Sequence, residues 1–152
     1  MINPLDYAYD EESLPNFYCN VVKHRATGRR WIFEVSDWKN DARAMFEFMH
    51  ALRHHDCRMV GFNNFYYDYQ LLHHCLTIGP EFTAAQAYEK SFALINTPRE
   101  AKFKDVVWGK EHFVKQIDLY LIHHFDNFAK STSLKEIEFN NRSRNIGDLA
   151  VD

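Results

Sequence analysis

The spacing of the apolar residues changes near residue 37, and this change constrains the fold more than any other feature of the sequence. Before it, Leu5, Tyr7 and Tyr9 alternate with polar or small residues, a period of two that is typical of a β-strand. Two similar runs follow, "NFYCNVV" and "RRWIFEV", with the turn-forming stretch "HRATG" between them. We therefore expect three short antiparallel strands joined by tight turns.

Beyond residue 37 the apolar residues recur with the period of an α-helix. One expected helix has an apolar face that comprises Ala42, Met45, Phe46, Met49 and Leu52. The compact run "CRMVGF" then predicts a buried strand, and a second helix follows it. The face of this second helix comprises Asp68, Leu71, Leu72, Cys75 and Leu76.

The rest of the chain adds one strand and one or two helices. "FVKQIDLYLIHHF" reads as a strand that leads into a helix, and Ser133 with Glu136 forms the capping-box pattern of a short helix. Residues 77–112 are harder to interpret, although "TAAQAYEKSFALI" contains good helix formers. These patterns predict an α/β fold with a five-stranded mixed sheet, in which three antiparallel strands precede parallel ones, flanked by helices.

Composition limits the class of protein. A chain of 152 residues that is 46% apolar and 16% aromatic is long enough for one folded domain with its own core. It has no long apolar segment and no basic leader, so we expect neither a membrane span nor a signal peptide. The three widely spaced cysteines predict reduced thiols and a cytoplasmic location.

The charge is weakly acidic overall but unevenly distributed. A net charge of −3 provides no general attraction to nucleic acid. Basic residues nevertheless gather at 23–30, in "KHRATGRR", and again at 102–115 and 140–145. Each group is either a set of solvated loop charges or part of a surface over which an anionic ligand approaches.

Three consecutive acids end the first predicted strand, in "YAYDEESLP". Residues i and i+2 of a strand point to the same face, so Asp10 and Glu12 should emerge side by side while Glu11 points away. Two adjacent carboxylates suit a divalent cation such as Mg²⁺, which takes one or two carboxylates from a protein. An ordinary acidic hairpin turn is the alternative.

A further acid, Asp68, heads the apolar face of the second helix in "NNFYYDYQLL". A buried carboxylate without a partner is costly, so Asp68 must either cap its own helix or meet a cation. If the strand at residues 57–62 lies beside the first strand, Asp68 arrives near Asp10 and Glu12, and the three carboxylates form a site for a hard cation.

These two motifs resemble the first two exonuclease motifs of the DEDD superfamily of 3′–5′ exonucleases. Asp10 and Glu12 match the Asp-x-Glu of the first motif, and Asn63, Tyr67 and Asp68 match the second motif, which reads Asn, three residues, aromatic, Asp. Most of the chain, including "IDLYLIHHFDNFAKSTSLKEIEF", is more narrowly similar to the proofreading domain at the N-terminus of bacteriophage DNA polymerases.

The resemblance implies a ribonuclease-H-like fold and two-metal hydrolysis of the terminal phosphodiester of single-stranded DNA. Asp10, Glu12 and Asp68 would hold two Mg²⁺ or Mn²⁺ ions, with Asp10 between them. Asn63 and Tyr67 would contact the 3′-terminal nucleotide or shape its cleft. A polymerase domain, in the same or a companion chain, is the implied partner, and the host cytoplasm is the implied location.

Aromatic side chains near these motifs have two interpretations. Phe17 and Phe65, beside Tyr67, could stack on the bases of a single-stranded end, since each such stack contributes ~1–3 kcal/mol. Both phenylalanines could equally belong to the core.

The family's third motif, a Tyr or His four or five residues before a last Asp, has no match downstream of Ser133, because Asp148 and Asp152 lack an appropriately placed Tyr or His. Asp118 and Asp126, the latter in "HHFD", are alternatives, although the resemblance implies that the region around Asp118 follows the last strand and usually does not bind metal. We therefore expect an exonuclease-like domain that is incomplete at its C-terminus. The alternative function is a non-catalytic ribonuclease-H-like module that binds nucleic acid or a protein partner.

Overall fold

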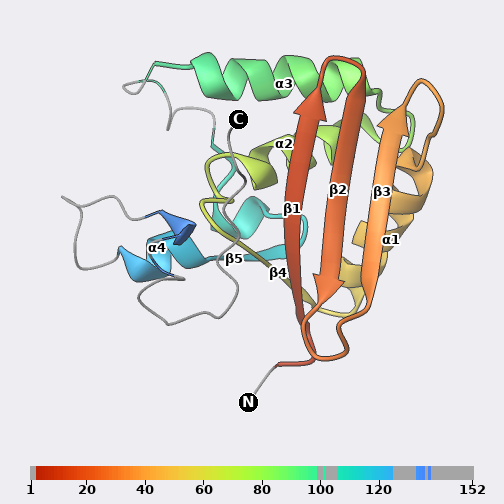
Figure 1. Cartoon of the computed structure of the whole chain (residues 1–152). Coiled ribbons are helices and arrows are strands. Elements are labelled where there is room, and N and C mark those ends of the chain that lie inside the picture. The colour runs from red at the N-terminus through yellow and green to blue at the C-terminus, as the bar shows by residue number, and fades with distance from the viewer. Residues whose placement is uncertain (1–2, 99–100, 102–105, 125–132, 136, 138–152) are drawn as a thin grey trace.

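A five-stranded mixed sheet forms the centre of the fold, with the strand order β3-β2-β1-β4-β5 (Figure 1). The structure is a computed structural model, and it describes residues 3–98, 101, 106–124, 133–135 and 137. The strands are β1 (Asp6–Leu14), β2 (Phe17–His24), β3 (Arg30–Ser36), β4 (Arg58–Gly61) and β5 (Lys115–Asp118). The first three pair antiparallel, whereas β4 runs parallel to both β1 and β5. The predicted α/β class and strand directions are confirmed, and the arrangement is consistent with a ribonuclease-H-like fold.

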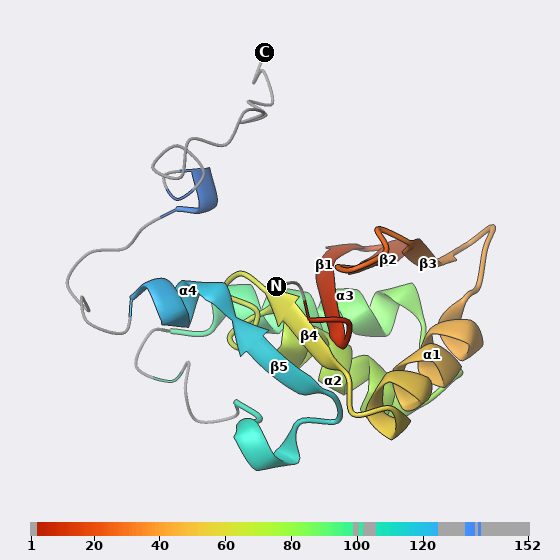
Figure 2. The same cartoon turned by 90° about the horizontal axis from the view of Figure 1, so that it is seen from below.

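Three helices pack on one face of the sheet, as Figure 2 shows from below. They are α1 (Ala42–His54), α2 (Asp68–Ile78) and α3 (Ala84–Asn96), and a short α4 (Leu119–His123) follows β5. The α3 helix begins with a capping box between Thr83 and Gln86. The short helix expected after Ser133 lies mostly outside the described residues.

The alternation of side chains along β1–β3 divides the sheet into two faces. We call the face that packs against α1–α3 the helix face, and the opposite face the outer face. The helix face is largely apolar, and its buried side chains include Tyr9, Tyr18, Val22, Phe33 and Val35. The expected face of α1 is confirmed, because Ala42, Met45, Met49 and Leu52 are buried.

The pairing between β1 and β4 brings the site together. It covers only Asp6–Ala8 of β1, so the C-terminal half of β1 extends beyond the end of β4. At that point the chain leaves β4 through residues 62–67 and enters α2 at Asp68. The expected neighbourhood of the strand at residues 57–62 and the first strand is confirmed.

No described helix has both the length and the apolar character needed to cross a membrane. The three cysteines are free thiols; Cys57 and Cys75 are buried, and Cys19 is half-buried on β2.

Candidate active site

The acids of β1 point to opposite faces of the sheet. Asp10 and Glu12 are exposed on the outer face, whereas Glu11 is only 4% exposed on the helix face. The period-two pattern of the strand therefore holds through all three acids. Asp10 and Glu12 lie on one face, as their spacing predicts.

The structure brings Asp68 next to Asp10. The backbone N–H of Glu11 contacts the carboxylates of both residues. This contact alone would lower the pKa of each, but burial has a larger effect and raises it. Because β4 ends before this point, the β4 side of β1 leaves room for the head of α2. Two carboxylates from distant parts of the sequence therefore converge on one backbone N–H.

The surroundings of the Asp68 carboxylate favour its protonated form. Burial and, next, the nearby charge of Asp10 raise the pKa of Asp68 to about 7. Asp68 is 8% exposed, and the N-cap position of its helix is Tyr67. The backbone N–H groups of Asp68 itself and of Glu11 favour its charged form, but less strongly than burial and Asp10 oppose it, so the start of its own helix compensates part of its charge, as the capping alternative predicts. Burial also raises the pKa of Asp10, although that side chain is exposed overall.

Tyr67 places a hydroxyl beside these acids. Its Oη lies 2.7 Å from Oγ of Ser91 on α3, and Ser91 is buried. Burial raises the pKa of Tyr67, and the hydrogen bond with Ser91 lowers it. The charges of Asp68, Glu11 and Glu12 raise it further, so the net pKa is above its usual value. The hydroxyl is therefore protonated at neutral pH and can donate a hydrogen bond.

The other predicted substrate contacts lie around this centre. Asn63 is exposed and has φ of 60°, and its backbone N–H donates to Asp118 rather than to a ligand. Phe17 is half-buried at the start of β2, opposite Leu14 of β1. Phe65 is half-buried, its ring lies 5.2 Å from that of His112, and it lines a shallow groove with Ile117 and Ile122. The structure thus clusters Tyr67 with the acids and places Phe65 toward β5 and α4.

Glu11 belongs to a buried polar group with Tyr18 and Asn20, and the sequence pattern did not predict this group. Its Oε1 accepts hydrogen bonds from Tyr18 Oη at 3.0 Å and from Asn20 Nδ2 at 2.6 Å. Burial and the charge of Asp68 raise the pKa of Glu11 well above its usual value. Oε2 of Glu11 and Oδ1 of Asn20 have no partner among the described residues, and a proton on Oε2 would let each satisfy the other. The signal was present in the sequence, because Glu11 shares its face with Tyr7 and Tyr9.

Asn64, rather than Asn63, is the buried asparagine of the second motif. Its Nδ2 donates to Tyr9 Oη at 3.2 Å and to Gln116 Oε1 at 3.0 Å, which ties the loop after β4 to β1 and β5. Gly61 makes room for it, since a Cβ at that position would lie 2.7 Å from the Asn64 Cβ. This pair positions the loop that leads to Asp68.

Asp118 has a structural role in the same region. It is 3% exposed, and its carboxylate accepts backbone N–H bonds from Asn63, Phe65 and Tyr120 at 2.9, 3.0 and 2.9 Å. It therefore caps α4 and holds the loop after β4. The acids Asp126, Asp148 and Asp152 lie outside the described residues.

The donor set suits a hard cation. Asp10 and Asp68 are oxygen ligands whose mutual repulsion a divalent ion would relieve, and Mg²⁺ needs only one or two carboxylates from the protein. Within the described part of the chain, no group of three or more His, Cys, Asp or Glu side chains is arranged to hold a metal. Asp10 and Asp68 are thus the two carboxylates that could bind such an ion together, with water or phosphate oxygens in the rest of its shell.

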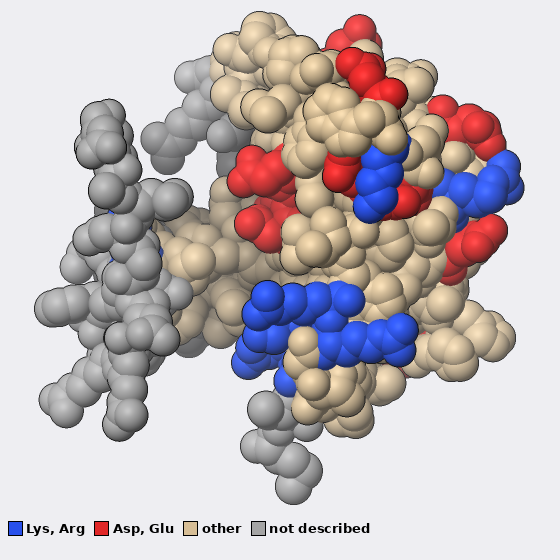
Figure 3. Space-filling model, turned by 45° about the vertical axis from the view of Figure 1, so that its right-hand side comes forward, with Lys and Arg blue, Asp and Glu red and all other residues tan. Residues whose placement is uncertain are grey.

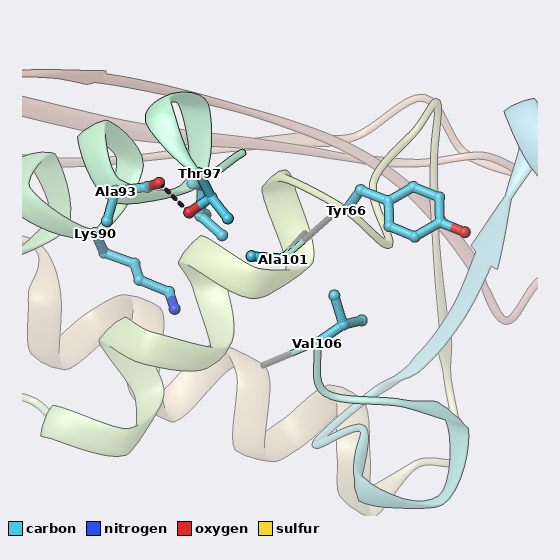
Figure 4. A pocket seen from close by; sticks show the side chains of 7 residues that line it. Tyr66, Lys90, Ala93, Thr97, Ala101 and Val106 are labelled. Atoms are coloured by element: carbon cyan, nitrogen blue, oxygen red, sulfur yellow. Dashed lines mark hydrogen bonds between the residues drawn. The ribbon is translucent and has the colours of Figure 1, made fainter. Parts of the chain in front are cut away.

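A pocket beside α3 offers no comparable chemistry (Figure 4). Its described lining contains no acid, histidine or cysteine, and Lys90 is its only charged residue. The lining residues are Tyr66, Lys90, Ala93, Leu94, Thr97, Ala101 and Val106. The carboxylates of β1 and α2 therefore remain the candidate centre.

Comparison of the chain with protein-family models, with curated proteins and with solved structures finds no match.

Proposed function

We propose that this chain is a metal-dependent 3′–5′ exonuclease domain that removes nucleotides from single-stranded DNA 3′ ends. The observation that carries the proposal is the convergence of Asp10 and Asp68 on the Glu11 N–H, where β1 extends beyond β4. Burying the Asp68 carboxylate beside the like charge of Asp10 is costly for the fold unless a cation joins the two. The resemblance of the two sequence motifs to exonuclease motifs supports the same conclusion.

In this proposal Asp10, Glu12 and Asp68 would hold Mg²⁺ or Mn²⁺ in a two-metal site. Ions held there would supply activation of an attacking water and stabilisation of the leaving 3′ oxygen of the penultimate nucleotide. Asp68 and Asp10 approach from different elements, so their separation is set by the packing of α2 against β1. The reaction adds water across the terminal phosphodiester and releases one nucleoside monophosphate.

The surrounding side chains orient the terminal nucleotide. The protonated Tyr67 hydroxyl, held by Ser91 beside the acids, is placed to donate to a phosphate oxygen. Asn63, Phe17 and Phe65 are assigned to the nucleotide more loosely, with the two rings as stacking surfaces. The expected partner is a polymerase domain in the same or a companion chain, as in phage-type proofreading, and the expected location is the host cytoplasm.

Cleavage of a 5′-labelled single-stranded DNA in Mg²⁺ or Mn²⁺ tests the proposal. We expect shortening from the 3′ end in the wild type, and a loss of at least about 10³-fold in Asp10→Ala, equal to about 4 kcal/mol of transition-state stabilisation. Glu47→Ala, an exposed acid on α1, is the matched control and should cleave normally. Wild-type chain that binds DNA but does not shorten it would refute the proposal.

The second candidate is a non-catalytic module that binds nucleic acid or a protein partner. The lack of a three-residue metal cluster among the described residues favours it. A thermal-shift titration with Mn²⁺ separates the two candidates. Stabilisation that disappears in Asp10→Ala supports the exonuclease, and an unchanged melting temperature supports the module.

A further inference from the structure

The outer face of the sheet carries a charge gradient whose acidic end includes Asp10 and Glu12 and whose basic end the proposed catalytic centre does not use. In the register of β1, β2 and β3, Glu12, Cys19 and Glu34 form one cross-strand row. The next row contains Asp10, Val21 and Ile32. The row after that contains Ala8, Lys23 and Arg30. The face therefore passes from acidic through apolar to basic along the strands, and Figure 3 shows red groups above a blue patch on one side of the molecule.

The basic end of this face continues into the β2–β3 turn. We use the name basic hairpin for Lys23, Arg25, Arg29 and Arg30, of which the three arginines are exposed. None of the four forms an ion pair with a described acid, in contrast to Arg58 nearby, which binds Asp6 at 2.6 Å. The Arg29 guanidinium lies 4.8 Å from the centre of the Trp31 ring, on the helix face, so Lys23 and Arg30 are the cations of the outer-face row. The four positive charges are thus gathered without an acid among the described residues to neutralise them.

The turn holds these cations in a defined place. The backbone N–H of Arg25 donates to the Asp6 carbonyl at 2.9 Å, and the Gly28 N–H donates to the His24 carbonyl at 2.9 Å. His24 contacts Thr27 and the Pro4 carbonyl through its two ring nitrogens, each at 2.7 Å. The basic hairpin is therefore anchored to the start of β1, the strand that carries Asp10.

The distance between the proposed catalytic acids and the basic hairpin suits a polymeric anion better than a single small anion. Lys23 lies one strand across and two residues along from Asp10, which corresponds to roughly 8 Å between Cα positions in a regular sheet. Val21 and Ile32, which are 37% and 58% exposed, lie between the acidic and the basic rows. Apolar side chains suit sugars and bases, whereas unpaired lysine and arginine suit the phosphates that follow along the strand.

We propose that the basic hairpin binds the phosphate backbone of single-stranded DNA on the 5′ side of the nucleotide that lies at Asp10. This inference rests on the proposed function, because it takes the carboxylates as the position of the 3′ end. It adds a second contact region on the same face, which binds the chain without reading its sequence.

Fluorescence anisotropy measures the contact between the basic hairpin and DNA. The probe is a labelled single-stranded DNA of about 12 nucleotides, a length that one binding module can span. The assay contains EDTA, so no cleavage occurs. The test variant is Lys23→Gln/Arg30→Gln. The matched control is Arg43→Gln/Lys110→Gln, which removes two exposed cations that lie off the outer face, on α1 and on the 3-10 helix η1 (Gly109–Glu111).

We expect the test variant to bind about tenfold more weakly at 0.1 M salt, and the slope of log K against log salt to fall by about 1.4, for two lost phosphate contacts. The control should keep the wild-type slope. Thermal melting confirms that both variants fold. Equal slopes for test and control would overturn the proposal, as would an acidic peptide or an RNA that binds the wild type more tightly than DNA.

The two proposals fail in different ways. Asp10→Ala should keep the salt dependence of DNA binding in EDTA while it abolishes cleavage. If the wild type does not cleave but the basic hairpin still determines the salt slope, the proposed function is wrong and the docking surface stands. If cleavage depends on Asp10 but the hairpin variant binds as the wild type does, the docking surface is wrong.

Discussion

Asp68 and Asp118 are both buried carboxylates near the ends of parallel strands, yet their surroundings are opposite. Asp118 receives backbone N–H bonds from Asn63, Phe65 and Tyr120, so its charge is compensated by the fold. Asp68 is buried beside Asp10, and its pKa is raised to about 7. The comparison separates a carboxylate whose charge the fold stabilises from one whose charged form the fold disfavours.

The largest expected effect is on catalysis, and it should distinguish the two acids. Asp68→Asn should reduce cleavage of single-stranded DNA at least about 10³-fold, because it removes a metal ligand but keeps the shape of the side chain. Asp118→Asn should retain cleavage in whatever fraction remains folded. Initial rates, corrected for folded fraction by circular dichroism, measure the difference. Equal losses in both variants would remove the distinction.

The next largest effect is on stability, and here the substitution of Asp118 should be the damaging one. Asp118→Ala should lower the free energy of unfolding by about 3–5 kcal/mol, since it removes the cap of α4 and leaves loop N–H groups unpaired. Urea unfolding measures the change. Glu81→Ala, at an exposed acid paired with Arg43, is the control and should cost less than about 1 kcal/mol. A loss at Asp118 no larger than that of the control would show that the loop does not depend on it.

Asp68→Asn should instead stabilise the metal-free chain above neutral pH. The folded-state pKa of Asp68, about 7, lies above its ordinary value of 3.8, so wild-type stability is greatest below about pH 4 and declines as the pH rises toward 7. The variant lacks this decline and should be more stable at pH 8 by about 2–4 kcal/mol, with no difference at low pH. Urea unfolding in EDTA at the two pH values checks it. A less stable variant at pH 8 would show that Asp68 already has a compensating partner.

The smallest expected effect concerns Glu11, which resembles Asp68 in burial but lies on the helix face. Its folded-state pKa is raised, so its contribution to stability is also full at low pH and is lost as the pH rises through that pKa. Glu11→Gln mimics the protonated acid, because the amide can donate to Asn20 while its oxygen accepts. We expect a gain of about 1–3 kcal/mol at pH 8, near-zero change at pH 4, and unchanged cleavage. Loss of cleavage in a folded Glu11→Gln chain would move this residue into the catalytic centre.

Much of the fold follows from local patterns in the sequence. The period-two run of Tyr7 and Tyr9 predicts β1, and the apolar face of Met45 and Met49 predicts α1, because both patterns depend on neighbours within a few residues. The same alternation places Asp10 and Glu12 on one face. The strand and helix around Asp68 were likewise predicted from "CRMVGF" and the residues after it.

The environment of each acid was decided by the tertiary structure. Burial of Glu11 against Asn20 depends on the register of β1 with β2, and the N–H bonds to Asp118 depend on β5 lying beside β4. The sequence contained the residues of the site and their spacing along each strand and helix. Their distances and charges required long-range packing, because the Glu11 N–H that joins Asp10 to Asp68 is free for both only where β4 ends and α2 begins.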